Sequence, residues 1–186
     1  MPLPPAAERE SIHTRKIDLQ AYRRRDGRYD VDAHLVDTKP FPFQRPNTPE
    51  AIPAGGALHD FWIRVVCNES LLIEDIIVAT DATPYPMCPE AAAALASVKG
   101  LRIGGGFQRA VRERLGGAKG CTHLMELLGP IGTAAFQALS PLRLAQPDRV
   151  DATGKPVKID SCYAYASNRD VVRVRWPAFY DGPAKG

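Results

Sequence analysis

Apolar and polar residues alternate along the first part of the chain, which predicts antiparallel strands. The dipeptide Asp26-Gly27 separates two such alternating runs, and Asp-Gly between alternating runs is a strong short-range hairpin signal. We therefore expect a β-hairpin over residues 15–38. Its apolar positions are Ile17, Leu19, Ala21, Tyr29, Val31, Ala33 and Leu35.

A second hairpin is predicted over residues 58–80, after a loop at 40–56 that is dense in proline and glycine. The turn falls at Asn68-Glu69-Ser70. The strand that follows this turn is apolar on both of its faces, with Ile73 and Ile77 on one and Ile76 and Val78 on the other. Such a strand is expected near the centre of a sheet, covered on both sides.

Helical spacing replaces alternation after Ala82. Glycines and prolines delimit three segments, which predicts helices near residues 89–99, 105–115 and 122–140. Two short alternating runs within residues 157–180 predict a terminal strand–turn–strand. The fold class expected is α+β: an antiparallel β-sheet with three helices packed on it, an added N-terminal hairpin and a C-terminal β tail.

Length and composition favour one globular domain. The chain has 186 residues, of which 45% are hydrophobic, and a net charge of +3. We expect flexible ends at 1–14 and 181–186, and a single domain at 15–180 with its core at 58–140. The start of the chain lacks the apolar region of a secretory signal, and no apolar run is long enough to span a bilayer.

These features predict a cytoplasmic protein with no membrane association, whose four cysteines are thiols or metal ligands rather than disulfides. Nucleic-acid binding is not expected, because the net charge is only mildly basic and the arginines around Asp26-Gly27 are typical of a solvated hairpin tip. Partners are not indicated by the sequence, and a homo-oligomer is left open.

Cysteines and histidines supply the candidate chemistry. Cys88 and Cys121 each lie at the start of a predicted helix, where the helix dipole favours the thiolate, which is both a nucleophile and a metal ligand. His123 is two residues beyond Cys121, and His59-Asp60 opens the second hairpin. The simpler alternative is that the cysteines are small buried core residues and that His59-Asp60 is a solvated strand end.

The order of these residues resembles the scaffold proteins of iron–sulfur cluster assembly, the NifU N-terminal type. The similar stretches are "HDFWIRVVCNESLLIEDIIVATDA" with the following cysteine, and "GCTHLMELLGPIGTAAFQAL", within residues 58–140. This resemblance implies ligands at His59, Asp60, Cys88 and at Cys121 or His123. The chain departs from the family in having a histidine in place of its first cysteine and a Cys-x-His in place of its adjacent His-Cys pair.

The chain as a whole more closely resembles a bacterial family known only as a domain of unknown function. The stretches that carry this resemblance are "YRRRDGRYDVDAHLVDTKPFPF", "LHDFWIRV", "PYPMCP" and "ERLGGAKGCTHLMELLGP". The resemblance to this family therefore implies no particular activity.

The residue types decide which metal is expected and leave three functions open. Cysteine and histidine suit zinc or a mononuclear iron better than magnesium or calcium. Asp60 is either a further ligand or a carboxylate that orients His59, and Cys162 is an additional candidate. The protein is then a small metal-binding protein acting as scaffold or carrier, or a metal- or cysteine-dependent enzyme that uses bound water or the Cys121 thiolate on a small molecule. The third reading is a non-catalytic module with buried structural cysteines.

Overall fold

The structure is a computed structural model, which describes residues 3–46 and 48–183. The chain separates into two compact units, Met1–Leu139 and Ser140–Gly186. The segment after residue 139 packs mainly on itself, and the expectation of a single domain at 15–180 stays a prediction. Residues 1–2 and 184–186, which belong to the ends expected to be flexible, lie outside the described residues.

The first unit is built on an antiparallel sheet of four strands in the order β1-β2-β3-β4. The strands are β1 (Thr14–Arg23), β2 (Tyr29–Thr38), β3 (Ala57–Cys67) and β4 (Ile73–Ala82). Both predicted hairpins are therefore confirmed, with turns at the predicted places. β4 was expected in the centre of the sheet, but it is an edge strand, and its apolar side chains on the outer face, such as Ile77, are exposed.

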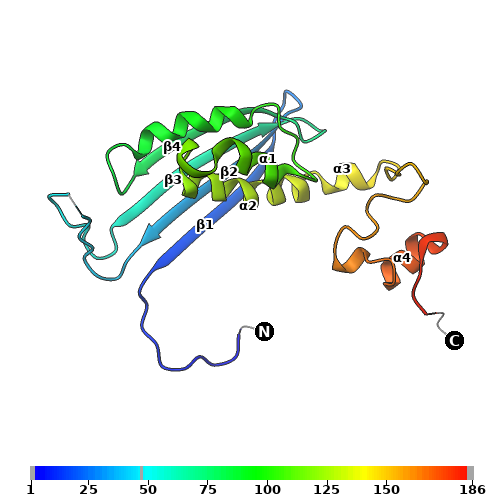
Figure 1. Cartoon of the computed structure of the whole chain (residues 1–186), viewed down its shortest axis with the longest axis horizontal. Helices are drawn as coiled ribbons and strands as arrows, with labels where there is room; N and C mark the ends of the chain where they lie inside the picture. Colours follow the sequence, from blue (N-terminus) through cyan, green and yellow to red (C-terminus); the bar gives the residue numbers. More distant parts are fainter. Residues whose placement is uncertain (1–2, 47, 184–186) are drawn as a thin grey trace. The chain divides into compact units, whose positions relative to one another are not determined.

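Helices cover one face of this sheet (Figure 1). They are the 3-10 helix η1 (Cys88–Val98), α1 (Phe107–Leu115), the short η2 (Gly117–Lys119) and α2 (Thr122–Ala138). The longest of them, α2, lies mainly against β1 and β2, whereas η1 lies against β4. The core between the layers is formed by alternate residues of β2 and β3 with the apolar stripe of α2, including Val31, Leu35, Phe61, Ile63, Leu124, Leu128 and Ile131.

The helical ranges differ from the prediction in type and number. The segment near 89–99 is a 3-10 helix, and α3 (Ser140–Leu144), α4 (Asp170–Arg175) and three short 3-10 helices add to the three elements expected. α1 packs directly on α2. A Cβ built on Gly132 would lie 3.1 Å from the buried ring of Phe107, so this glycine allows α1 to approach α2.

The second unit has no β tail in its described part, which corrects the prediction for residues 157–180. It contains α3, η3 (Tyr163–Tyr165), α4 and η4 (Pro177–Phe179). The valines of α4 alternate in sequence, but only Val172 is buried, and Asp170 lies in the first turn, where a carboxylate favours a helix. Alternation alone was misleading because no partner strand is available to complete a ladder.

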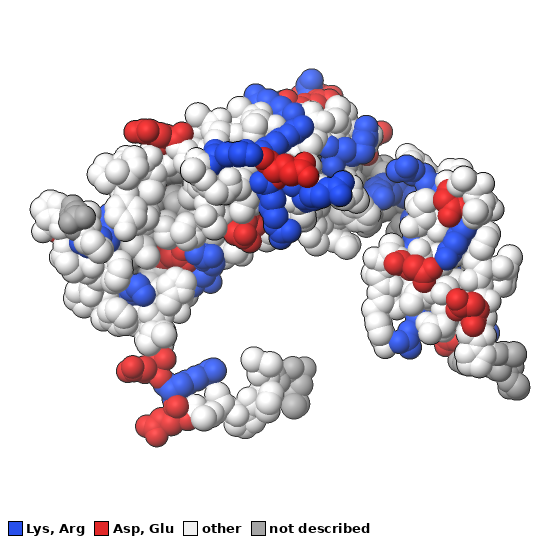
Figure 2. All heavy atoms as spheres, in the orientation of Figure 1, with Lys and Arg blue, Asp and Glu red and all other residues white. Residues whose placement is uncertain are grey.

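Surface charge is mixed. On the face drawn in Figure 2, lysine and arginine side chains gather in the region of α1, which carries Arg109, Arg112 and Arg114, and acidic side chains lie among them. Within the described residues, no helix is both long enough and apolar enough to cross a membrane.

Candidate metal centre

A row of polar residues crosses the helix-covered face of the sheet at one end. Arg15 of β1 is the cross-strand partner of Asp37 of β2, and Asp37 is the partner of His59 of β3. All three belong to the register that points toward the core, two residues beyond Ile17, Leu35 and Phe61 respectively. A bulge follows Asp37, and bulges often re-aim side chains at functional sites.

Asp37 is the centre of this row and is almost fully buried, with 1% of its side chain exposed. Arg15 donates to both carboxylate oxygens, from Nε to Oδ1 at 2.8 Å and from the guanidinium NH2 group to Oδ2 at 2.7 Å. His59 Nδ1 lies 2.9 Å from Oδ2, and His13 Nε2 lies 3.2 Å from Oδ1. Four nitrogen atoms therefore lie within 3.2 Å of the two carboxylate oxygens.

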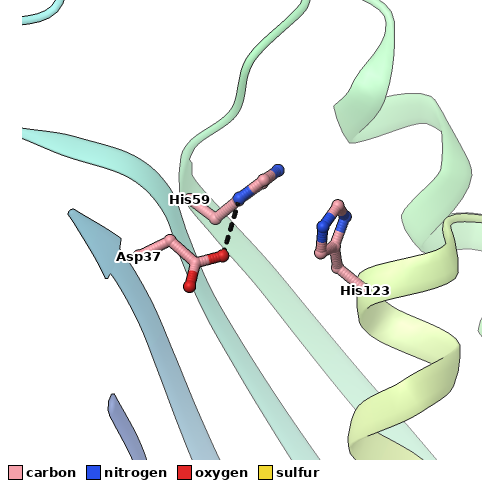
Figure 3. Close-up of side chains that lie close together, drawn as sticks. All are labelled: Asp37, His59 and His123. Atoms are coloured by element: carbon pink, nitrogen blue, oxygen red, sulfur yellow. Dashed lines mark hydrogen bonds and ion pairs between the residues drawn. The ribbon is translucent and has the colours of Figure 1, made fainter. Parts of the chain in front are cut away.

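His123 completes the group from the layer above. It lies in the first turn of α2 and extends toward His59 (Figure 3), and the centroids of the two imidazole rings are 4.0 Å apart. Potential ligand atoms of Asp37, His59 and His123 all lie within 4.8 Å of one another. Among the described residues this is the one such group of three or more histidine, cysteine, aspartate or glutamate side chains.

Burial and the neighbouring charges together determine the protonation states. Burial lowers the pKa of His59 and the neighbouring His123 lowers it further, which outweighs the opposing hydrogen bond to Asp37. Burial and then the charge of Arg15 lower the pKa of His123. Burial on its own would raise the pKa of Asp37, but Arg15 and His59 outweigh it and hold that pKa below its usual value. At neutral pH the site therefore holds one carboxylate and two neutral imidazoles.

The hydrogen bond to Asp37 fixes the tautomer of His59. An ionised carboxylate only accepts, so Nδ1 carries the proton and Nε2 carries a lone pair. His59 Nε2 is buried and has no hydrogen-bond partner. Because a buried polar atom without a partner is costly, this nitrogen is the feature of the site that most needs a ligand.

Asp60 does not join this group. Adjacent strand residues point to opposite faces of a sheet, so Asp60 faces away from His59, on the side of the sheet opposite α2. There its Oδ1 lies 2.7 Å from Nε2 of His34, whose ring stacks on Trp62 with centroids 3.6 Å apart. The prediction treated His59-Asp60 as a strand end rather than as strand, and so placed both on one side.

The two candidate cysteines differ in position. Cys121 immediately precedes α2 as its N-cap residue, and its Sγ lies 4.0 Å from His123 Nδ1, so it is next to the group. Cys88 begins η1 on the β4 side of the sheet and is not among the grouped residues. Cys162 is an exposed residue of the second unit. Whether any of these residues binds a metal stays a prediction.

Three residues of the site were not predicted: His13, Arg15 and Asp37. Asp37 could have been identified from the sequence. It lies two residues after the buried Leu35 of β2, so the alternation of the strand places its carboxylate on the core face. Arg15 continues the register of Ile17 in the same way. Neither His13 nor Arg15 could be joined to Asp37 until the exact register of β1 against β2 was known.

The fold and the site together define an α+β protein with a sheet covered on one face and a His/Asp cluster, able to accommodate a cation, at one end of that sheet. The chain belongs to a family described as protein of unknown function (DUF2889), which matches residues 13–137. The match contains every residue of the cluster and ends just before the boundary between the two units.

Neither the curated proteins nor the solved structures contain a match to this chain. The resemblance to iron–sulfur scaffold proteins therefore finds no support in these comparisons, whereas the resemblance to a domain of unknown function is confirmed.

Proposed function

We propose that this protein binds a transition-metal ion, zinc or iron, between His59 and His123. The observation that carries the proposal is the buried lone pair on His59 Nε2, which has no partner and lies beside a second neutral imidazole. Neutral imidazoles are the form that binds metal, and nitrogen ligands suit zinc and iron.

Asp37 acts in this proposal mainly as the group that orients His59. Its charge is already balanced by Arg15 at 2.7 Å, so direct ligation of a metal would require displacing a bidentate ion pair. A carboxylate that accepts the other ring N–H of a ligating histidine is the common arrangement around zinc. The alternative, in which Asp37 is itself the third ligand, requires its bond to His59 to open.

Cys121 is the proposed third ligand. Its Sγ is 4.0 Å from His123 Nδ1, and two donor atoms on one tetrahedral zinc are about 3.3–3.6 Å apart for bonds of about 2.0–2.3 Å. Cys121 is not part of the group whose ligand atoms lie within 4.8 Å of one another, so its side chain must move toward His59 when the metal binds. His59, His123 and Cys121 would leave a fourth position open. An open position allows a metal-bound water or a transferred ligand, which is compatible with a carrier and with an enzyme.

The test is metal binding by the full chain after treatment with a chelator. Titration with Zn²⁺ and Fe²⁺ measures affinity, and Co²⁺ reports the ligands through its absorption, because a thiolate ligand adds a charge-transfer band in the near ultraviolet. We expect His59→Ala and His123→Ala to abolish tight binding, Asp37→Asn to weaken it about 10–100-fold, and Cys121→Ser to remove the charge-transfer band.

The other face of the sheet supplies a matched control. His34 and Asp60 form a second histidine–aspartate pair, with side chains 27% and 26% exposed, so His34→Ala and Asp60→Asn should leave metal binding unchanged. Wild-type protein that binds none of these ions, or His59→Ala and His123→Ala variants that bind them normally, would refute the proposal. A charge-transfer band that disappears in Cys88→Ser would instead support the iron–sulfur-scaffold-like set of ligands.

A second candidate function is a cysteine-dependent enzyme in which His123 is the base for the Cys121 thiol. The distance of 4.0 Å between Sγ and Nδ1 favours it. In metal-free protein, His123→Ala should then slow alkylation of Cys121 by iodoacetamide while alkylation of Cys162 is unchanged. Equal rates in the two proteins would rule out this pairing.

A further inference from the structure

The free edge of β1 is a second feature that the proposed function does not use. β1 pairs with β2 over ten consecutive residues without a bulge, and only Leu19 among its residues is even half-buried. Figure 1 shows β1 as the outermost strand on its side of the sheet. Within the described residues, no backbone hydrogen bond reaches β1 from that side.

The opposite edge of the sheet is treated differently. The pairing of β4 with β3 is interrupted by two register shifts, and the segment after η1 hydrogen-bonds to the outer side of β4, through Ile73 N to Leu101 O at 2.9 Å and Gly100 N to Ile73 O at 2.8 Å. Bulges and covering segments are two of the usual protections against edge-to-edge pairing, and charged side chains are a third. β1 has neither of the first two, and it contains no proline.

The backbone groups that β1 leaves free can be identified from the hairpin. Arg24 N donates to Arg28 O at 2.9 Å, next to the last pair of the β1–β2 ladder. Because hydrogen-bonded residues alternate along an antiparallel strand, the even-numbered residues of β1 bond to β2. The N–H and C=O groups of Arg15, Ile17, Leu19, Ala21 and Arg23 therefore point away from the sheet.

We propose that β1 pairs antiparallel with β1 of a second copy of this chain, about a twofold axis at Ile17, to form a continuous sheet of eight strands. Charge complementarity between the two strands supports this pairing. This register places Lys16 opposite Asp18 of the second copy, twice by symmetry, and Ile17 opposite Ile17. It also places the stem of Arg15 beside Leu19 of the second copy on the helix-covered side.

The neighbouring registers are disfavoured by like charges. A twofold axis at Asp18 places Asp18 opposite its own copy, and an axis at Leu19 places Arg15 opposite Arg23. A shift by an odd number of residues turns the apolar side of one strand to the polar side of the other. The axis at Ile17 is therefore the register that the side chains of β1 select.

Sedimentation equilibrium of the full chain over a range of concentrations tests the dimer. Lys16→Asp replaces two attractions by two repulsions and should weaken dimerisation about tenfold, and Lys16→Asp with Asp18→Lys should restore it. Ile17→Pro removes an outward N–H without removing a bond to β2, so it should yield a monomer whose circular dichroism is that of the wild type.

Matched lysine substitutions on the two edge strands provide the control. Ile17 and Ile77 are 43% and 54% exposed, so Ile17→Lys should abolish the dimer and Ile77→Lys should not affect it. A monomer at all concentrations would overturn the proposal. So would a dimer whose dissociation constant is the same in Lys16→Asp as in the wild type. Metal binding does not enter this experiment, so its outcome is independent of the proposed function.

Discussion

Replacing Asp37 by asparagine is the perturbation that most directly examines the polar row. Asparagine has the same shape but no charge. Its NH2 group replaces one of the two carboxylate oxygens that accept hydrogen bonds from Arg15 and His59. We expect Asp37→Asn to lower the free energy of unfolding at neutral pH in metal-free protein. The size of the effect follows from what becomes of each partner.

The partners of Asp37 differ in their access to water. Removing one member of a fully buried ion pair costs about 3–5 kcal/mol. Arg15 and His13 have 37% and 39% of their side chains exposed, so both regain water when Asp37 loses its charge. His59, with 7% of its side chain exposed, does not, and a hydrogen bond to a charged group contributes about 1.5–3 kcal/mol. We therefore expect a loss of about 2–3 kcal/mol.

The measurement is urea unfolding of the full chain, followed by circular dichroism at neutral and acid pH. Asp60→Asn is the control, because its pair with His34 is about one quarter exposed and such pairs contribute about 1 kcal/mol or less. Equal losses in Asp37→Asn and Asp60→Asn would show that burial of the row does not decide its energetics.

The pH dependence provides an independent check on the same variant. The pKa of Asp37 is lower in the folded protein than its usual value, so the folded state binds this proton less readily than the unfolded chain does. Its contribution is fully present above the unfolded pKa of about 3.9 and is lost as the pH falls through the folded pKa. The difference between the wild type and Asp37→Asn should therefore shrink below about pH 4. A difference that is constant down to strongly acid pH would refute the assignment.

Two further predictions concern the thiols and the contact between α1 and α2. Burial raises the pKa of the Cys67 thiol to about 11, so this thiol should react slowly with iodoacetamide at neutral pH. Mass spectrometry of the treated metal-free protein should find Cys162 modified first, Cys88 and Cys121 next, and Cys67 last. Early modification of Cys67 would contradict its burial. Gly132→Ala should destabilise the protein by about 1–2 kcal/mol, because overpacking against the Phe107 ring exceeds the gain in helix propensity. In Gly129→Ala the new Cβ meets only the end of the flexible Gln108 side chain, so thermal unfolding should show little change, and equal losses in both variants would contradict the packing argument.

The strands were predictable from the sequence because their pattern is local. Alternation fixed both hairpins over 15–38 and 58–80, and the Asp26-Gly27 and Asn68–Ser70 turns fixed their registers to within a residue or two. The position of β4 at an edge was not predictable in this way, because an apolar strand has the same pattern whether its second face is covered or exposed. The helical C-terminal segment was missed since β-branched valines alternate in sequence without a partner strand.

The candidate site was half predictable. His59, Cys121 and His123 were identified from their positions at strand and helix starts, and His59 and His123 do lie together. Asp37 and Arg15 were missed because their roles arise from cross-strand pairing, which brings residues 15, 37 and 59 into one row. Cys88 was included because the chain leaves β4 at the same end of the sheet as His59, but η1 lies on β4 while α2 lies on β1 and β2.

The polar row of Arg15, Asp37 and His59 either stabilises the fold or serves to position His59 for a metal. A buried ion pair replaced by apolar residues of similar volume is often as stable as before or more stable, because the desolvation of the charges is no longer required. A variant with Arg15→Met, Asp37→Leu and His59→Leu should therefore be more stable to urea than Asp37→Asn, which leaves the buried His59 without its carboxylate.

The same triple variant should bind neither zinc nor cobalt tightly, because His59 is gone and only His123 and Cys121 remain of the three proposed ligands. A variant that is stable but does not bind would mean that the polar row is unnecessary for folding, as expected if it serves the lone pair of His59 Nε2. If the triple variant is instead less stable than Asp37→Asn, the row contributes to the fold through hydrogen bonds that apolar side chains cannot replace. The cluster would then be explained by structure, and the metal-binding proposal would lose its main support.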